Sequence, residues 1–307
     1  MQPFRVYIIL LLCVPFVFCQ CNQQAGKESE AEYKKNIRQW RKKRLQSLKS
    51  PDGWLNLAGL YWLDQGKNTM GSDSTMDVVF PEKAPGRLGT LYLEEGHITF
   101  VPHPGIQVMQ DGKPLKKKKS LKSDAEGKAT RLTHGSLKWF VIKRGDQYGI
   151  RLRDRESPLL DKVDHIPAFP VKPRWKIRAT FVAYDPPRSI EIPNVLGGTY
   201  KDELPGELRF EYEGRQYTLY PTGTRENLFV VFGDNTNAEQ TYGGGRFLSV
   251  EGPDKKNITF LDFNKAYNPP CAFTPYATCP LPPRENILPF KVRAGEKAPD
   301  IDVPHGH

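Results

Sequence analysis

Short runs of alternating apolar and polar residues fill most of the chain after residue 54. Such alternation is typical of strands with one buried face, and glycine-containing turns such as 94–96 and 111–112 separate the runs. The pattern predicts strands at residues 90–93, 97–101, 106–110, 130–133, 137–143, 149–153, 175–184, 189–192, 207–212, 216–220, 228–232, 246–250 and 258–263. No amphipathic helix separates these runs, so we expect a mainly β fold, an antiparallel β-sandwich or barrel-like sheets.

Residues 28–49 show a different, helical pattern without glycine or proline. Side chains that recur at three- and four-residue steps form one stripe, which comprises Tyr33, Ile37, Trp40, Arg41, Arg44, Leu45 and Leu48. Pro51 ends the pattern, because the residue before a proline disfavours the helical conformation. We therefore expect an N-terminal amphipathic helix with a basic outer face.

An apolar run at residues 6–18 follows Arg5 and is shorter than the ~20 residues of a membrane span, which indicates a secretory leader. Cys19 and Cys21 come next, and either is a candidate for lipidation. Phe18 and Gln20 precede these cysteines, although small residues are usual at that position. Lipidation, plain cleavage and a retained anchor all place the mature chain outside the cytoplasm, as a membrane-anchored lipoprotein or a periplasmic protein.

The length of 307 residues allows one large domain or two small ones. We divide the chain into a leader (1–21), a polar linker with the amphipathic helix (22–50), a β-rich domain (51–298) and a flexible tail (299–307). Asp185-Pro186-Pro187 marks a candidate boundary between two sub-sheets. The sequence leaves open whether the halves share one core.

The net charge of +10 is concentrated in two acid-free segments. The first segment contains Lys34, Lys35, Arg38, Arg41, Lys42, Lys43, Arg44 and Lys49, and the second contains six lysines at residues 113–122. In an exported protein we expect no nucleic acid partner, so the basic segments suggest anionic lipid or polysaccharide, and the run from Lys34 to Lys49 suggests an anionic membrane surface. The alternative is a solvated helix face and a charged hairpin tip.

Residues 267–283 contain six prolines and directly follow an apolar run. Prolines fix their own φ angle and restrain the preceding residue, which predicts a rigid, extended loop. Polar residues at the end of a strand that continues into such a loop could form a site on a rigid scaffold. The candidates here are Asp262, Asn264, Tyr267 and Asn268.

This region resembles a family of uncharacterised bacterial and archaeal proteins, DUF1684. The matching residues include Asp262-Phe263-Asn264, residues 266–273, residues 275–280 and Glu285-Asn286, with Gly53-Trp54-Leu55, Arg151, Arg153-Asp154, Asp234 and Gly245-Arg246 earlier in the chain. The resemblance spans roughly residues 30–298 and implies no established activity.

Cys271 and Cys279 admit several interpretations. In an oxidising compartment they could form a disulfide that closes the loop. A free Cys271 could instead act as a nucleophile if a base lowered its pKa. A metal site has no support from a matching cysteine or histidine spacing, so we expect neither a metal nor a cofactor.

Three arginines are candidates for binding an anion. Arg151 and Arg153 are two residues apart on a predicted strand and share a face, and Arg246 begins a later strand. The alternative is that these groups pair with acidic residues in a buried polar network. Arg144-Gly145-Asp146 is interpreted only as a hairpin turn.

The main hypothesis is a cell-envelope β protein that binds a small polar or anionic ligand between the last strands and the 267–283 loop. A hydrolase or transferase that uses Cys271 or Asp262 is one alternative. A structural envelope lipoprotein, in which the loop is only a stapled cap, is the other. The sequence leaves open whether the chain is an enzyme.

Overall fold

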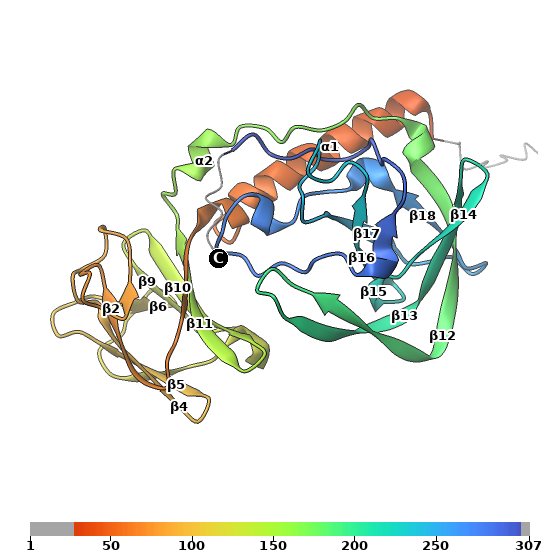
Figure 1. Ribbon diagram of the computed structural model, residues 1–307. Helices are drawn as coiled ribbons and strands as arrows, with labels where there is room; N and C mark the ends of the chain where they lie inside the picture. Colours follow the sequence, from red (N-terminus) through yellow and green to blue (C-terminus); the bar gives the residue numbers. More distant parts are fainter. Residues whose placement is uncertain (1–27, 302–307) are drawn as a thin grey trace, which may run out of the picture.

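The computed structural model describes residues 28–301 and divides the strands between two lobes (Figure 1). The N-terminal lobe contains a six-stranded and a five-stranded sheet, and the C-terminal lobe contains two four-stranded sheets. Each lobe has its own hydrophobic core. The leader, with Cys19 and Cys21, and tail residues 302–307 lie outside the described residues.

The N-terminal lobe comprises β1 (Leu57–Trp62), β2 (Gly66–Gly71), β3 (Val78–Val79), β4 (Gly89–Glu94), β5 (His97–Pro102), β6 (Met109–Gln110), β7 (Lys113–Pro114), β8 (Lys119–Leu121), β9 (Arg131–His134), β10 (Leu137–Arg144) and β11 (Gln147–Asp154). The strand orders are β1-β11-β10-β9-β6-β7 and β3-β2-β4-β5-β8. Trp139 lies at the centre of this core, where its ring meets Phe80 and Phe100 edge-on.

The C-terminal lobe comprises β12 (Lys176–Pro193), β13 (Thr199–Tyr212), β14 (Arg215–Leu219), β15 (Thr222–Thr224), β16 (Asn227–Asp234), β17 (Arg246–Glu251), β18 (Ile258–Asp262) and β19 (Ile287–Leu288). The strand orders are β14-β13-β12-β18 and β15-β16-β17, with β19 beside β16. Phe263 is completely buried and contacts the rings of Trp175 and Phe232.

Within residues 28–301, two α-helices accompany the sheets, α1 (Glu30–Lys49) and α2 (Leu159–Lys162). Short 3₁₀ turns are η1 (Trp54–Asn56), η2 (Asp124–Glu126), η3 (Pro173–Trp175), η4 (Phe263–Lys265), η5 (Pro270–Ala272) and η6 (Arg284–Asn286). The strand pairs are antiparallel except β2–β3 and β16–β19. The prediction of a mainly antiparallel β fold with barrel-like curvature and an N-terminal helix is therefore confirmed.

Helix α1 lies across the C-terminal lobe (Figure 1). The hydroxyl of Ser29 accepts a hydrogen bond from the amide of Glu32, which caps the first turn. The helix buries Tyr33, Ile37 and Leu48, all members of the predicted stripe. In the part of the chain that the structure describes, no helix is long and apolar enough to cross a membrane.

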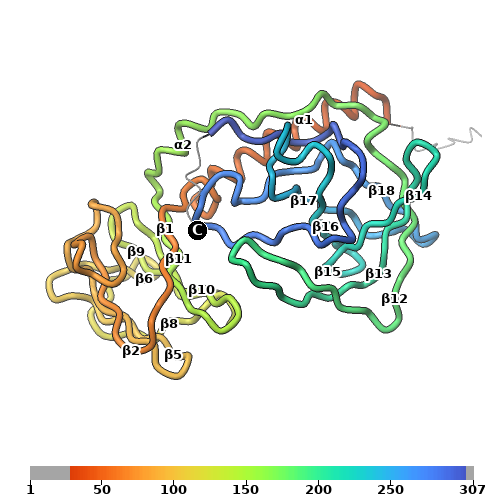
Figure 2. Tube along the Cα trace, in the orientation of Figure 1, coloured from red at the N-terminus to blue at the C-terminus, as the bar shows by residue number. Residues whose placement is uncertain are grey.

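The chain passes from one lobe to the other over residues 155–175, which contain α2 (Figure 2). Asp185, the candidate boundary from the sequence, lies inside β12, which pairs with β13 on both sides of an irregularity between Ala183 and Arg188. The two prolines lack amide donors, so they interrupt the ladder without ending the strand. Beyond the interruption, Ile190 and Leu204 belong to a small cluster of their own.

The docking of α1 can be tested at Ile37, which is completely buried. Ile37→Ala should lower the free energy of unfolding by about 2–5 kcal/mol, because it leaves a cavity under the helix. Urea unfolding measures this change, and Lys35→Ala, on the exposed side of α1, should stay within about 0.5 kcal/mol. Equally small effects at both positions would mean that α1 does not pack on the lobe.

Candidate functional site

Arg246 begins β17 and is completely buried. Its guanidinium donates to Oδ2 of Asp234 at 2.6 Å and to the carbonyl oxygen of Val292 at 2.9 Å. The second carboxylate oxygen of Asp234 accepts from both the amide and the hydroxyl of Thr236. Burial lowers the pKa of Arg246, and the carboxylate of Asp234 opposes this shift. Arg246 thus takes part in a buried polar network, the alternative considered for it.

Asp262 ends β18 and Asn264 lies in η4, and both contact helix α1. The hydroxyl of Tyr33 donates to Oδ1 of Asp262 at 2.6 Å, and the side-chain amide of Asn264 donates to the Tyr33 hydroxyl at 2.9 Å. Burial and the Asp262 carboxylate raise the pKa of Tyr33. Asn264 also exchanges hydrogen bonds with the backbone of Lys172. These two residues hold α1 and a connecting segment at the end of β18.

Tyr267 and Asn268 have a similar role. The ring of Tyr267 lies 4.7 Å from the guanidinium carbon of Arg44 in α1. The side chain of Asn268 donates to the carbonyl of Lys297 at 2.6 Å, and its backbone amide donates to the buried carboxylate of Glu296 at 2.7 Å. Contacts that position α1 or the C-terminal segment therefore engage the four loop candidates, Asp262, Asn264, Tyr267 and Asn268, and also Arg246.

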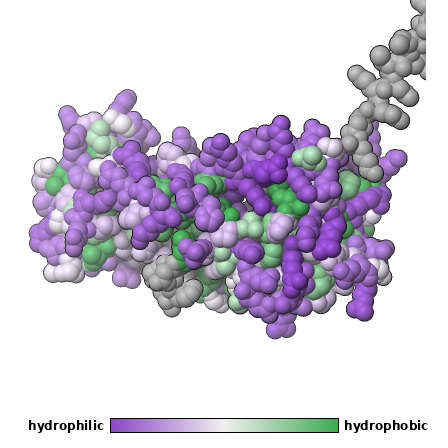
Figure 3. Space-filling view, turned by 90° about the horizontal axis from the view of Figure 1, so that it is seen from above, coloured by the Kyte–Doolittle hydropathy of each residue, from purple (hydrophilic) through white to green (hydrophobic). Residues whose placement is uncertain are grey.

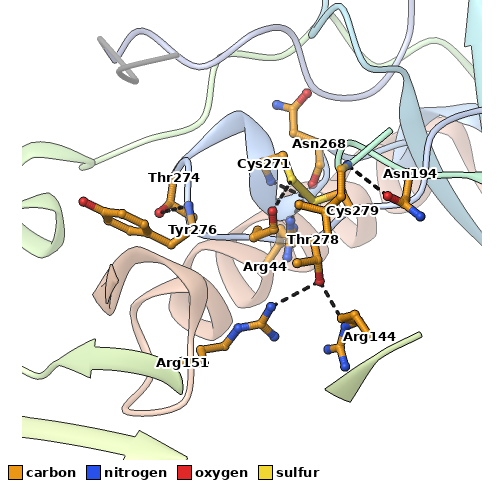
Figure 4. The surroundings of a disulfide bond; sticks show 12 residues. Arg44, Arg144, Arg151, Asn194, Asn268, Cys271, Thr274, Tyr276, Thr278 and Cys279 are labelled. Atoms are coloured by element: carbon orange, nitrogen blue, oxygen red, sulfur yellow. Dashed lines mark hydrogen bonds between the residues drawn. A yellow bond between two sulfur atoms is a disulfide. The ribbon is translucent and has the colours of Figure 1, made fainter. Parts of the chain in front are cut away.

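Cys271 and Cys279 form a disulfide, with their Cα atoms 6.2 Å apart (Figure 4). Of the interpretations left open by the sequence, the disulfide is the one that the structure contains. While this bond is intact, Cys271 has no thiol for nucleophilic attack. The bridge belongs to a small apolar cluster that joins Leu57 of the N-terminal lobe to Val231 and Phe247 of the C-terminal lobe.

Arg151 and Arg153 lie on β11 and share a face, as predicted. Their guanidinium carbons are 5.6 and 5.5 Å from the ring of Trp54. Arg153 donates to Oδ1 of Asn56 at 2.8 Å and to the carbonyl of Gly53. Burial lowers the pKa of each arginine to about 10. Arg153 is therefore engaged in holding η1 against β11.

Arg151 instead points toward the disulfide loop (Figure 4). One of its terminal nitrogens donates to the hydroxyl of Thr278 at 3.2 Å, and Nε of Arg144 donates to the same oxygen at 3.1 Å. The two lone pairs of this hydroxyl are then used, which leaves its proton free to be donated. Arg144 also pairs with Asp124 at 2.9 Å.

The Thr278 hydroxyl lies at a cleft of about 510 Å³ between the two lobes. Its lining residues are Lys143, Arg144, Gly145 and Gln147 near the β10–β11 turn, Asn194, Leu196, Gly198, Thr199 and Tyr200 near the β12–β13 turn, and Thr278. The charged residues in this lining, Lys143 and Arg144, are both cations.

Sequence reasoning identified Arg151, which lies behind Thr278, but missed most of the residues that line this cleft. The turn containing Arg144 was identified, but its side chain was not singled out. Thr278 was identified only as part of the family motif. Tyr200 was not identified as a candidate, because no predicted strand included it. A basic residue at a hairpin turn was the one available signal, and it is common on protein surfaces.

The structural role of Arg246 can be tested by Arg246→Met. We expect a loss of about 3–5 kcal/mol in the free energy of unfolding, because Asp234 would stay buried without its counter-charge. Urea unfolding measures the loss, and Arg178→Met, at an exposed position of β12, is the control. If the variant has unchanged stability but binds anions less tightly, Arg246 is a ligand-binding residue and its structural role is refuted.

Comparison with known proteins gives a family for the chain but no activity. No curated protein matches it. An uncharacterised protein of Haloarcula marismortui, solved by NMR, is 30% identical over 45% of this chain and 78% of its own length, with a TM-score of 0.38. The N-terminal FHA domain of S. cerevisiae Rad53p, in complex with a phosphothreonine peptide, is 12% identical over 36% of this chain and 76% of its own, with a TM-score of 0.17. That score is too low to indicate a shared fold. The family model described as "Protein of unknown function (DUF1684)" matches residues 161–297, and the chain belongs to this family.

Proposed function

We propose that this protein binds a small oxyanion, a carboxylate or phosphate group, in the cleft between the lobes. This proposal rests on Arg151, whose guanidinium is buried without a carboxylate partner among the described residues. This side chain is 4% exposed, and its Nε atom, like that of Arg246, has no hydrogen-bond partner among those residues. Its terminal nitrogen donates to Thr278, which lines the cleft.

The cost of burying a charge supports this proposal. A buried cation without a counter-charge is expensive, and proteins normally pair it. Arg246 follows that rule through Asp234 at 2.6 Å. The nearby carboxylate of Asp124 pairs with Arg144 rather than with Arg151. A ligand anion would supply the missing charge, and guanidinium groups bind carboxylate and phosphate through paired hydrogen bonds.

The proposed site binds the expected class of ligand, a small anion, but lies at a different place from the one that the sequence predicts. The cleft uses the 267–283 loop through Thr278, but it faces the β10–β11 and β12–β13 turns rather than the last strands. The disulfide at Cys271 and the hydrogen bond from Tyr33 to Asp262 give no specific support to a hydrolase or transferase. We propose the cell envelope as the location, because the leader indicates export.

Arg151→Gln should weaken anion binding about tenfold or more, because hydrogen bonds to charged groups contribute about 1.5–3 kcal/mol. Calorimetry and thermal shifts with phosphate, sulfate and acetate at constant ionic strength measure the change. Arg131→Gln is the matched control, since Arg131 lies exposed on β9 and pairs with Asp52. Equal anion affinity in the Arg151 variant and the wild-type protein would refute the proposal.

We propose separately that α1 contacts an anionic membrane surface. Lys35, Arg38, Lys42 and Lys43 are exposed on the helix, whereas Arg41 and Arg44 turn inward to backbone carbonyls. Seen from above, the molecule presents a mainly hydrophilic surface (Figure 3). Basic side chains near an anionic leaflet contribute about 1 kcal/mol each.

Glutamate substitution at all four exposed positions of α1 should weaken binding to phosphatidylglycerol vesicles by about 100-fold or more. Vesicle co-sedimentation at low and high salt measures this. Lys116→Glu, Lys117→Glu and Lys118→Glu together provide a control with a similar change of charge on the other lobe. If both sets weaken binding equally, net charge rather than α1 is responsible.

A further inference from the structure

The cleft of the proposed function has an apolar side as well as a cationic one. Leu196 and Tyr200, near the β12–β13 turn, line it together with Arg144 and Thr278. Leu196 is 38% exposed and Tyr200 is 44% exposed, and both are among the few large hydrophobic side chains that stay exposed in residues 28–301. Leaving such side chains in water forgoes the stabilisation that burial would give.

The β12–β13 turn is bonded to the disulfide loop. The amide of Val195 donates to the carbonyl of Cys279 at 3.1 Å, and the amide of Leu281 donates to the carbonyl of Pro193 at 2.7 Å. Val195 also packs against the apolar cluster around the disulfide. The apolar side of the cleft is therefore attached to the same loop that carries Thr278, and the two sides are held in fixed relation.

The turn also has internal support. The amide of Asn194 donates to the carbonyl of Gly198 at 2.9 Å, and Oδ1 of Asn194 accepts from the amide of Leu196 at 2.9 Å. Burial, and next the carboxylate of Asp202, raise the pKa of Tyr200. Its hydroxyl is therefore neutral at physiological pH and does not repel an anion.

We propose that the ligand is an amphiphilic oxyanion. Its phosphate or carboxylate group would lie at Arg144 and Thr278, next to the Arg151 guanidinium that donates to Thr278, and an aromatic or short aliphatic group would cover Leu196 and Tyr200. This inference rests on the proposed function. The cleft volume of about 510 Å³ supports it, because this size suits an organic ligand and far exceeds a single inorganic anion.

The test compares two series of probes by calorimetry under non-reducing conditions at constant ionic strength. Inorganic phosphate, glycerol phosphate, phenyl phosphate and hexyl phosphate form one series, and acetate and benzoate form the other. We expect at least one apolar member to bind about tenfold or more tightly than its polar counterpart, because its apolar surface leaves water in the cleft. The series with the larger gain identifies the anionic group.

Leu196→Ser and Tyr200→Ser should remove this gain while leaving the affinity for the inorganic or smallest anion unchanged. Both side chains are well exposed, so we expect both variants to fold, and thermal unfolding verifies this. Phe260→Ser is the matched control, since Phe260 is 47% exposed on β18, away from the residues that line the cleft.

The outcomes separate this inference from the proposed function. If anions bind through Arg151 but apolar groups add no affinity, the amphiphilic ligand is refuted and the anion site stands. A gain that survives in both serine variants also refutes it, because the apolar group then lies elsewhere. If no phosphate or carboxylate binds, the proposed function and this inference fail together.

Discussion

The Thr278 hydroxyl links the two lobes of this protein. It accepts hydrogen bonds from Arg144 and Arg151 of the N-terminal lobe. The next residue, Cys279, is bonded to Cys271 and accepts a hydrogen bond from the β12–β13 turn of the C-terminal lobe. The disulfide loop is thus the common support of the cleft, and its many prolines keep that support stiff.

The chain contains two opposite solutions for a deeply buried arginine. Both terminal nitrogens of Arg246 donate to a carboxylate or to backbone carbonyls, so its charge is paired within the fold. Arg151 has one described side-chain hydrogen bond, to a hydroxyl, and no ion pair with a described carboxylate, whereas Nε is unpartnered in both arginines. Burying the charge of Arg151 without a counter-charge costs folding free energy. A bound anion would offset this cost by pairing with the guanidinium. Arg151 therefore differs from Arg246 in having no carboxylate partner, although both side chains are buried.

Much of the fold could be predicted from the sequence, because the alternation or helical spacing of apolar residues indicates which face of a strand or helix is buried. The stripe from Tyr33 to Leu48 and the shared face of Arg151 and Arg153 follow from local periodicity. The role of Arg246 could not be predicted, because its partner Asp234 and the carbonyl of Val292 come from separate parts of the chain. Only tertiary structure distinguishes an arginine that is paired with a carboxylate from one that has no such partner. The residues Arg144 and Tyr200 were missed for the same reason, since two distant turns form one cleft.

A ligand in this cleft would contact both lobes at once. Its anionic group would meet side chains of β10 and β11, and its apolar group would meet the β12–β13 turn. Binding energy of this kind adds to the stability of the state in which the lobes are correctly placed. Tight binding requires that the two sides of the cleft keep their separation without the ligand. In a mobile cleft, part of the binding free energy would be lost in ordering the protein. The Cys271–Cys279 bridge and the backbone hydrogen bonds around it hold the two sides of the cleft together without a ligand, because the bridge lies at the junction of the two lobes and not inside either core.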